Sequence, residues 1–102
     1  MESAIWKFTL AESVEKLKDK VTFTSARRVR DWLHVGLDPA GVLCVWAEMD
    51  MGEVSPHAPR NADGLFAYDA YIVGTGNPFT VPSGVSYRGT AALGWFVAHV
   101  YV

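Results

Sequence analysis

The sequence is poor in the features that mark secreted, disulfide-bonded or membrane-spanning proteins. Its 102 residues include a single cysteine, Cys44, so no disulfide can form within the chain. No apolar run approaches the roughly 20 residues that cross a bilayer. The first residues mix acidic, basic and apolar side chains, unlike a secretory signal peptide. These absences predict a soluble protein of a reducing compartment, with no membrane partner.

Excess charge of one sign is also missing. Nine basic and eleven acidic residues leave a net charge of -2. Such a chain has no overall field that attracts a polyanion, so we expect no nucleic-acid polymer as a partner. Any charged site must be local.

Metal-binding and catalytic motifs are absent too. A structural zinc site needs closely paired ligands, whereas His34, His57, His99 and Cys44 are scattered along the chain. We therefore expect no metal and no cofactor. His99 lies between Ala98 and Val100, which is typical of a hydrogen-bonded histidine on a half-buried strand, and Cys44 is expected in the core.

Carboxylates near the middle of the chain are the basis for one alternative, in which the protein is an enzyme. The group comprises Asp50, Glu53, Asp63 and Asp69, with His57 among them. General acid-base catalysis needs such groups to converge on one substrate atom. No Ser, Thr or Cys has a recognised nucleophile motif around it. We expect a protein that is not an enzyme, and keep degradation of a signal molecule as an alternative.

What the sequence does contain is strand periodicity. Apolar and polar side chains alternate, or apolar side chains run continuously, over seven short segments separated by turn residues. These segments are 4–10, 20–24, 28–37, 42–50, 65–73, 85–93 and 95–102. Residues 11–20 suit either a short amphipathic helix or a solvated loop, and 51–64 form a long connection. The pattern predicts one all-β domain over 1–102, a small barrel or a two-sheet sandwich.

Two of these segments have a predictable place in a sheet. Asp38, Pro39 and Gly41 occupy the positions that a type I turn prefers, so the chain should reverse there. The returning segment 42–50 is apolar on both faces and should be central. The last segment should be paired, because an exposed apolar edge promotes aggregation. We expect internal closure or a homo-oligomer built through an edge.

One strand face carries the main candidate binding site. Simple alternation places Arg28, Arg30, Trp32 and His34 in one row, with guanidinium groups for phosphate and an indole for a base. Trp46 would widen this platform if it lay across the hairpin. The alternative is an ordinary solvated strand face.

The second candidate site is the turn Gly74-Thr75-Gly76. Glycines let a ligand approach the backbone amides closely, so this turn could bind a phosphate. Arg88 is a further candidate phosphate partner. The sequence lacks the spacing of a dinucleotide motif and the lysine of a P-loop. The alternative is a strand-ending turn that needs positive backbone angles.

Several short motifs, spread from end to end, resemble a family of small uncharacterised proteins of phage and prophage genomes. They are Ile5-Trp6-Lys7-Phe8, Leu43-Cys44-Val45-Trp46-Ala47 with Asp50, Ile72-Val73-Gly74-Thr75-Gly76 with Pro78, Tyr87 with Gly89-Thr90, and His99-Val100. The chain departs from the family by a longer loop over 51–64, by extra residues before Val21, and by Ala98 in place of Trp. The resemblance implies an accessory protein acting in the host cytoplasm.

Two functions follow as hypotheses. In the first, a non-catalytic anti-defence protein binds and sequesters a host immune nucleotide through the candidate residues above. In the second, the chain inhibits a host defence protein or complex by docking on it, as anti-CRISPR proteins do. Aromatic side chains, which protein interfaces favour, motivate the second.

Overall fold

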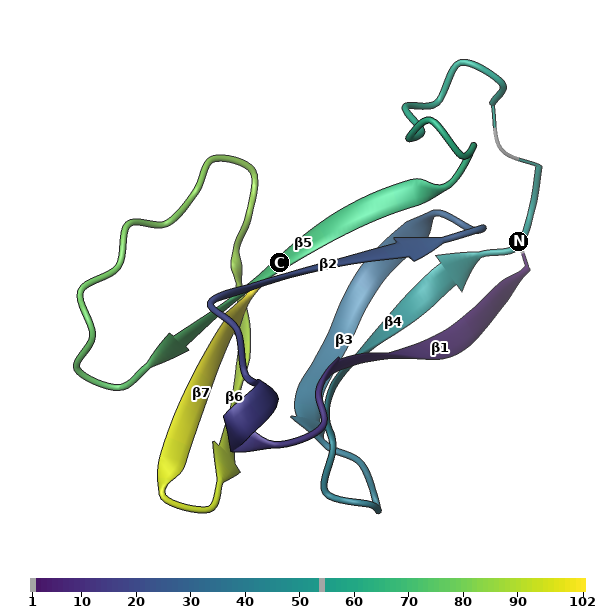
Figure 1. Ribbon diagram of the computed structural model, residues 1–102. Helices are drawn as coiled ribbons and strands as arrows, with labels where there is room; N and C mark the ends of the chain where they lie inside the picture. Colours follow the sequence, from purple (N-terminus) through teal and green to yellow (C-terminus); the bar gives the residue numbers. More distant parts are fainter. Residues whose placement is uncertain (1, 54) are drawn as a thin grey trace.

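The computed structural model describes residues 2–53 and 55–102, and it shows an all-β protein of two antiparallel sheets (Figure 1). The described residues contain no α-helix and one 3-10 turn, η1 (Val14–Lys16), where a short helix or loop was expected. The strands are β1 (Ser3–Ala11), β2 (Lys20–Ser25), β3 (Val29–Leu37), β4 (Leu43–Asp50), β5 (Phe66–Gly74), β6 (Tyr87–Leu93) and β7 (Phe96–Tyr101). The prediction of seven strands is confirmed.

The first sheet has the order β1-β4-β3. Its centre is β4, as its two apolar faces predicted, and Leu43, Val45 and Met49 are fully buried. The β3–β4 reversal at Asp38 is also confirmed. Gly41 N donates to Asp38 O at 2.9 Å, and Gly41 has a φ of 80°, which favours glycine.

The second sheet has the order β2-β5-β7-β6. The last strand, β7, therefore lies between two neighbours, and the expectation that it would be paired is confirmed. Its inward residues Ala98 and Val100 are fully buried and belong to the main core cluster. Neighbouring strands of the same chain therefore cover both edges of β7, so association through this strand is not needed. A homo-oligomer stays a prediction.

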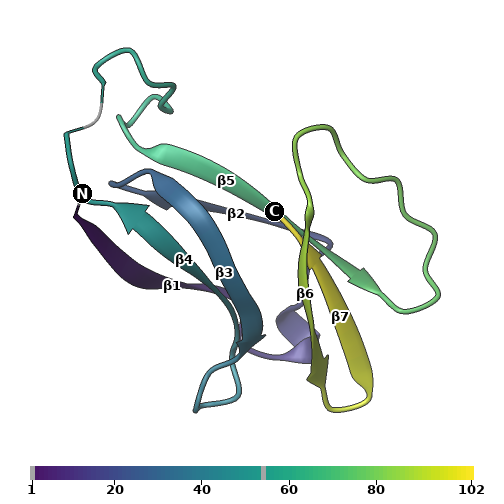
Figure 2. The same ribbon diagram turned by 180° about the vertical axis from the view of Figure 1, so that it is seen from behind.

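The sheets pack face to face and approach each other closely along β3 and β6 (Figure 2). At this seam Gly89 faces Val35, and a Cβ on Gly89 would lie 2.9 Å from that of Val35. Elsewhere Tyr68 of β5 accepts a hydrogen bond from Val29 N at 2.8 Å. Phe8 of β1 meets Phe23 of β2 with ring centroids 4.9 Å apart. Aromatic side chains thus bridge the sheets away from the seam.

Two long connections leave this core. Residues 51–65 lack strand or helix where the structure describes them, as expected for 51–64, and Val54 lies outside the described residues. Arg27 fixes the start of this loop by donating to the carbonyls of Met51 and Gly52 at 3.1 and 3.0 Å. The other connection, 75–86, extends beyond the end of β5 (Figure 1). In the described chain, no helix has the length and hydropathy needed to span a membrane.

Candidate functional site

The expected row of basic and aromatic residues on β3 does not form. The pairing of β3 with β4 shifts between Val29 and Asp31 and again between Trp32 and His34. Each shift places one extra residue in β3 and reverses the faces of the residues that follow. Trp32 consequently points inward and packs edge-on against Tyr68, with ring centroids 5.3 Å apart. The prediction that Trp32 forms an open stacking platform is wrong.

His34 and Trp46 do share the outer face of the first sheet. They are paired across β3 and β4, with ring centroids 5.5 Å apart. Trp32 is instead paired with Ala47, whose side chain is fully buried. The two indoles therefore lie on opposite faces of the sheet and cannot stack one ligand together.

The three candidate arginines have different surroundings. Arg30 binds Asp50 at 3.1 Å and Glu48 at 3.5 Å, and it also donates to the Ser3 hydroxyl. Its charge is therefore balanced by two carboxylates. Arg28 lines a small pocket beside Phe66 and Tyr68. Arg88, on β6 of the other sheet, donates from Nε to Val102 O at 3.2 Å. These arginines form no common phosphate site.

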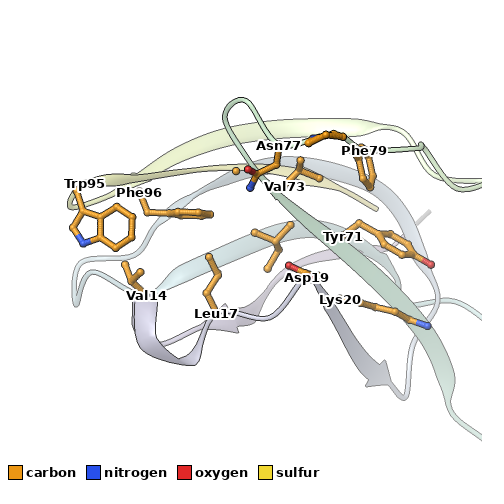
Figure 3. A pocket seen from close by; sticks show the side chains of 13 residues that line it. Val14, Leu17, Asp19, Lys20, Tyr71, Val73, Asn77, Phe79, Trp95 and Phe96 are labelled. Carbon is orange, nitrogen blue, oxygen red and sulfur yellow. The ribbon is translucent and has the colours of Figure 1, made fainter.

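The candidate turn after β5 lies beside a hollow in the surface, which we call the cleft. Its volume is about 640 Å³, and Gly74 is among its lining residues. One end is apolar: Val14 of η1 and Leu17, which directly follows η1, face Phe96 and the indole of Trp95 (Figure 3). Trp95, in the β6–β7 turn, has 85% of its surface exposed. The cleft therefore presents a large, solvent-accessible ring surface.

The other end of the cleft has charged side chains next to the rings of Tyr71 and Phe79 (Figure 3). Asp19 and Lys20 line it at the start of β2, with Tyr71 on β5, and Asn77 lies across the middle (Figure 3). Lys20 makes a 3.7 Å contact with Asp69 between two exposed side chains. Exposed pairs of this kind are weak. Lys20 is therefore available to a bound anion.

Two backbone groups of β5 beside the cleft are already hydrogen-bonded. β2 begins at Lys20, so β5 continues past it with one side unpaired. On that side, however, Ile72 N donates to Asp19 O at 2.8 Å and Asn77 N donates to Gly74 O at 3.2 Å. A peptide adding a strand here would have to break these bonds. The cleft is better suited to a ligand that contacts side chains.

Gly74 and Gly76 have different structural roles in the turn. A Cβ on Gly74 would lie 2.9 Å from a ring carbon of Phe96 and 2.8 Å from the side-chain nitrogen Nδ2 of Asn77. Gly76 has a φ of 85° and open space around it. The strand-ending turn that needs a positive backbone angle is thus present. At Gly74, the lack of a side chain lets the side chains of Phe96 and Asn77 pack closely against the backbone that lines the cleft.

A second pocket of about 330 Å³ lies on the other side of this turn, over the outer face of the second sheet. Thr75, Gly76 and His99 line it. Thr75 Oγ1 lies 2.7 Å from His99 Nε2, and Thr90 Oγ1 lies 2.9 Å from His99 Nδ1. Thr90 is bonded in turn to the hydroxyl of Tyr87. His99 is therefore half-buried and hydrogen-bonded, as predicted.

Other candidate chemical groups are dispersed. Asp50 binds Arg30 on the first sheet, while Asp69 accepts a 2.6 Å hydrogen bond from Thr22 on the second. Among the described residues, no three His, Cys, Asp or Glu side chains gather as metal ligands. Cys44 is fully buried, and burial raises the pKa of its thiol. A raised pKa disfavours the reactive thiolate.

The sequence interpretation missed the cleft residues Asp19, Lys20, Trp95 and Phe96. One signal was present: Trp95 directly follows Gly94, so an indole stands in a hairpin turn, where polar residues are usual. No periodicity could have brought residues 14–20 next to it, because that contact depends on how the two sheets pack.

Comparison with curated proteins gives no match, and neither does comparison with solved structures. A family match does cover the whole chain, in keeping with the end-to-end spread of the short motifs. Residues 1–102 match the domain of unknown function DUF7352, and the chain belongs to that family.

Proposed function

We propose that this protein binds and sequesters a nucleotide in the cleft without acting on it chemically. The observation that carries the proposal is the make-up of the cleft: an exposed indole at one end, a lysine at the other and a volume of about 640 Å³. Ligand pockets generally range over roughly 300–1,000 Å³ and combine apolar walls with a few polar groups. The cleft has both properties.

Each part of a nucleotide has a partner in the cleft. A base can stack on Trp95 beside Phe96, a contact worth about 1–3 kcal/mol per base in nucleic-acid-binding proteins. The Asn77 carboxamide offers both a donor and an acceptor to a base edge. Lys20 can bind a phosphate, and Asp19 can accept from ribose hydroxyls. The order of these groups along the cleft follows the order of parts in a nucleotide (Figure 3).

Sequestration without catalysis is supported by the cleft lining. Its residues, all within the described part of the chain, include one carboxylate, Asp19, and neither histidine nor cysteine. Hydrolysis of a phosphate ester generally uses a metal, a nucleophile or an acid-base pair. The cleft lining therefore favours binding over turnover.

The biological setting of this proposal comes from the motif resemblance. A phage accessory protein acting in the host cytoplasm would gain from removing a nucleotide that signals infection. We therefore place the ligand among host immune nucleotides. This assignment depends on analogy of genome context, whereas the cleft supports nucleotide chemistry in general.

Tryptophan fluorescence and thermal unfolding with a panel of mono-, di- and cyclic nucleotides test the proposal. We expect a subset to quench fluorescence and raise Tm, with Trp95→Ala weakening binding at least about tenfold through the lost stacking energy. Trp46→Ala is the control, because Trp46 lies on the outer face of the other sheet. No response to any nucleotide at millimolar concentration would remove the proposal.

Exposed apolar side chains support the second function, inhibition of a host defence protein by docking. Besides Trp95, the second sheet and its adjoining loop expose Val81, Tyr87 and Val97. Exposed aromatic side chains are common anchors of protein interfaces. Two results together would favour this function instead. No nucleotide of the panel would change fluorescence or Tm, and the wild type would recover a stoichiometric host protein that Trp95→Ala does not recover.

A further inference from the structure

The cleft and the second pocket are neighbours, separated by the backbone turn that follows β5. Four residues line both cavities: Val73, Gly74, Asn77 and Phe79. Building on the proposed function, we infer that the ligand is a dinucleotide. One base lies in the cleft, the other lies in the second pocket, and the phosphate-containing linker runs from the Lys20 end of the cleft past Phe79, which lines both cavities (Figure 3).

The second pocket has the surfaces that a second base requires. Phe79 and Tyr101 stand there with ring centroids 5.0 Å apart, tilted by 47°. They offer aromatic surface on one side of the pocket. Val81 adds apolar area on the loop side. The pocket thus repeats, on a smaller scale, the combination of rings and polar groups seen in the cleft.

Thr75 supplies the main hydrogen-bonding group of this pocket. The side chain is exposed, and its hydroxyl is held at 2.7 Å from His99 Nε2. His99 is held in turn by Thr90 at 2.9 Å. A hydroxyl has one donor and two acceptor positions, so this bond leaves capacity for a ligand. The chain through Thr90 fixes the orientation of Thr75 before a ligand arrives.

Volume separates a dinucleotide from smaller ligands. The second pocket, at about 330 Å³, is near the lower limit of known ligand pockets, which is roughly 300 Å³. It has room for a single ring system with its sugar. A mononucleotide in the cleft would leave it empty, whereas a molecule with two linked bases uses both cavities and gains the advantage of a covalent link.

Isothermal titration with AMP, linear pApA and cyclic di-AMP, together with the guanine equivalents, tests this inference. We expect at least one dinucleotide to bind about tenfold or more tightly than its mononucleotide. Thr75→Val should abolish that difference while leaving mononucleotide affinity within about twofold. Thr75→Ser, which keeps the hydroxyl, should restore it. Thr80→Val is the matched control, since Thr80 is on the same loop but outside the pocket lining.

The outcomes separate the two proposals. Nucleotide binding with equal affinities for mono- and dinucleotides, or with no effect of Thr75→Val, overturns the dinucleotide inference and leaves the nucleotide cleft standing. An absence of all nucleotide binding by a folded wild-type protein overturns the proposed function, and the inference with it. Tm values for each variant show whether a loss of affinity comes from unfolding.

Discussion

Gly74 is the residue at which the fold and the cleft depend most directly on each other. Adding a methyl group would bring it within 2.9 Å of the Phe96 ring. We predict that Gly74→Ala lowers the free energy of unfolding by about 1–3 kcal/mol through overpacking. Relief of the clash should push Phe96 into the cleft and weaken nucleotide binding about tenfold. Urea denaturation and titration measure the two effects.

Gly76→Ala provides the comparison, because a methyl group there contacts nothing within 4 Å. Its φ of 85° is unfavourable for alanine, so stability should fall by about 1–2 kcal/mol. Mononucleotide affinity should stay unchanged, because Gly76 lines the second pocket and not the cleft. If both variants lost affinity equally, Gly74 would have no special relation to the cleft.

Trp32 shows why part of the site was unpredictable at the level of single residues. Strand alternation places it beside Arg30 and His34, and an unbroken β3 would have kept it there. Two bulges instead turn Trp32 toward Tyr68 and the core. No turn residue such as glycine marks either bulge. Burial of the Trp32 side chain against the core is favourable, and this favours the inward position. Tertiary packing, and not local alternation, therefore determines on which face of β3 Trp32 lies.

At the scale of elements, one ion pair connects β1 to the turn between β3 and β4. Lys7 Nζ donates to Asp38 Oδ2 at 2.8 Å. This bond raises the pKa of Lys7 above its ordinary 10.5. It also lowers the pKa of Asp38 below its ordinary 3.8, with further help from the backbone N–H of Val42. The pair is therefore formed across the neutral pH range.

The signs of these pKa shifts give a pH prediction. The Asp38 contribution to stability is present above 3.8 and is lost as pH falls through the lowered pKa. The Lys7 contribution is present below 10.5 and is lost as pH rises through the raised pKa. We expect Lys7→Met to lower the urea midpoint at pH 7 and to have a smaller effect at pH 2. Equal effects at both pH values would contradict this linkage.

Lys16→Met is a suitable control for that experiment. Lys16 pairs with Glu12 at 3.1 Å, but both side chains are largely exposed on the connection between β1 and β2. Solvent screening leaves such a pair with little effect on stability. Its removal should leave the urea midpoint nearly unchanged at either pH.

Element boundaries were the most predictable feature of this protein. The Asp38 turn and the apolar segment of β4 are specified locally, by turn residues and by burial on both faces. The expected strand 95–102 is also present as Phe96–Tyr101. The segment 11–20 was ambiguous because Val14 and Leu17 suit either a helix or a loop. Its middle part forms η1, and both Val14 and the following Leu17 pack against the core.

At the scale of the whole molecule, the cleft is a product of sheet packing. Its walls come from η1, the start of β2, the end of β5 and the β6–β7 turn, which are far apart in the sequence. Local sequence patterns predict each of these elements, but they do not predict that the elements lie next to one another in the fold. By contrast, Gly74 and Thr75 were identifiable, because a glycine-containing turn after a buried strand is a local feature.

The seam between β3 and β6 sets how the two sheets are placed relative to each other. A methyl group on Gly89 would lie 2.9 Å from the Cβ of Val35, which is buried and cannot move aside. We predict that Gly89→Ala costs about 1–3 kcal/mol of stability by forcing the sheets apart. Hydrogen exchange should then accelerate in β3 and β6 together.

Gly36→Ala distinguishes this seam from a general effect of replacing a strand glycine. Its nearest neighbour would be the Nε2 atom of His34, 2.7 Å away at the end of an exposed side chain that can rotate. Alanine is preferred to glycine in a strand by about 0.5–1 kcal/mol, which offsets a small adjustment of His34. Stability should therefore change little. If Gly36→Ala destabilised the protein as much as Gly89→Ala, close contact at Val35 would not be what fixes the packing of the two sheets.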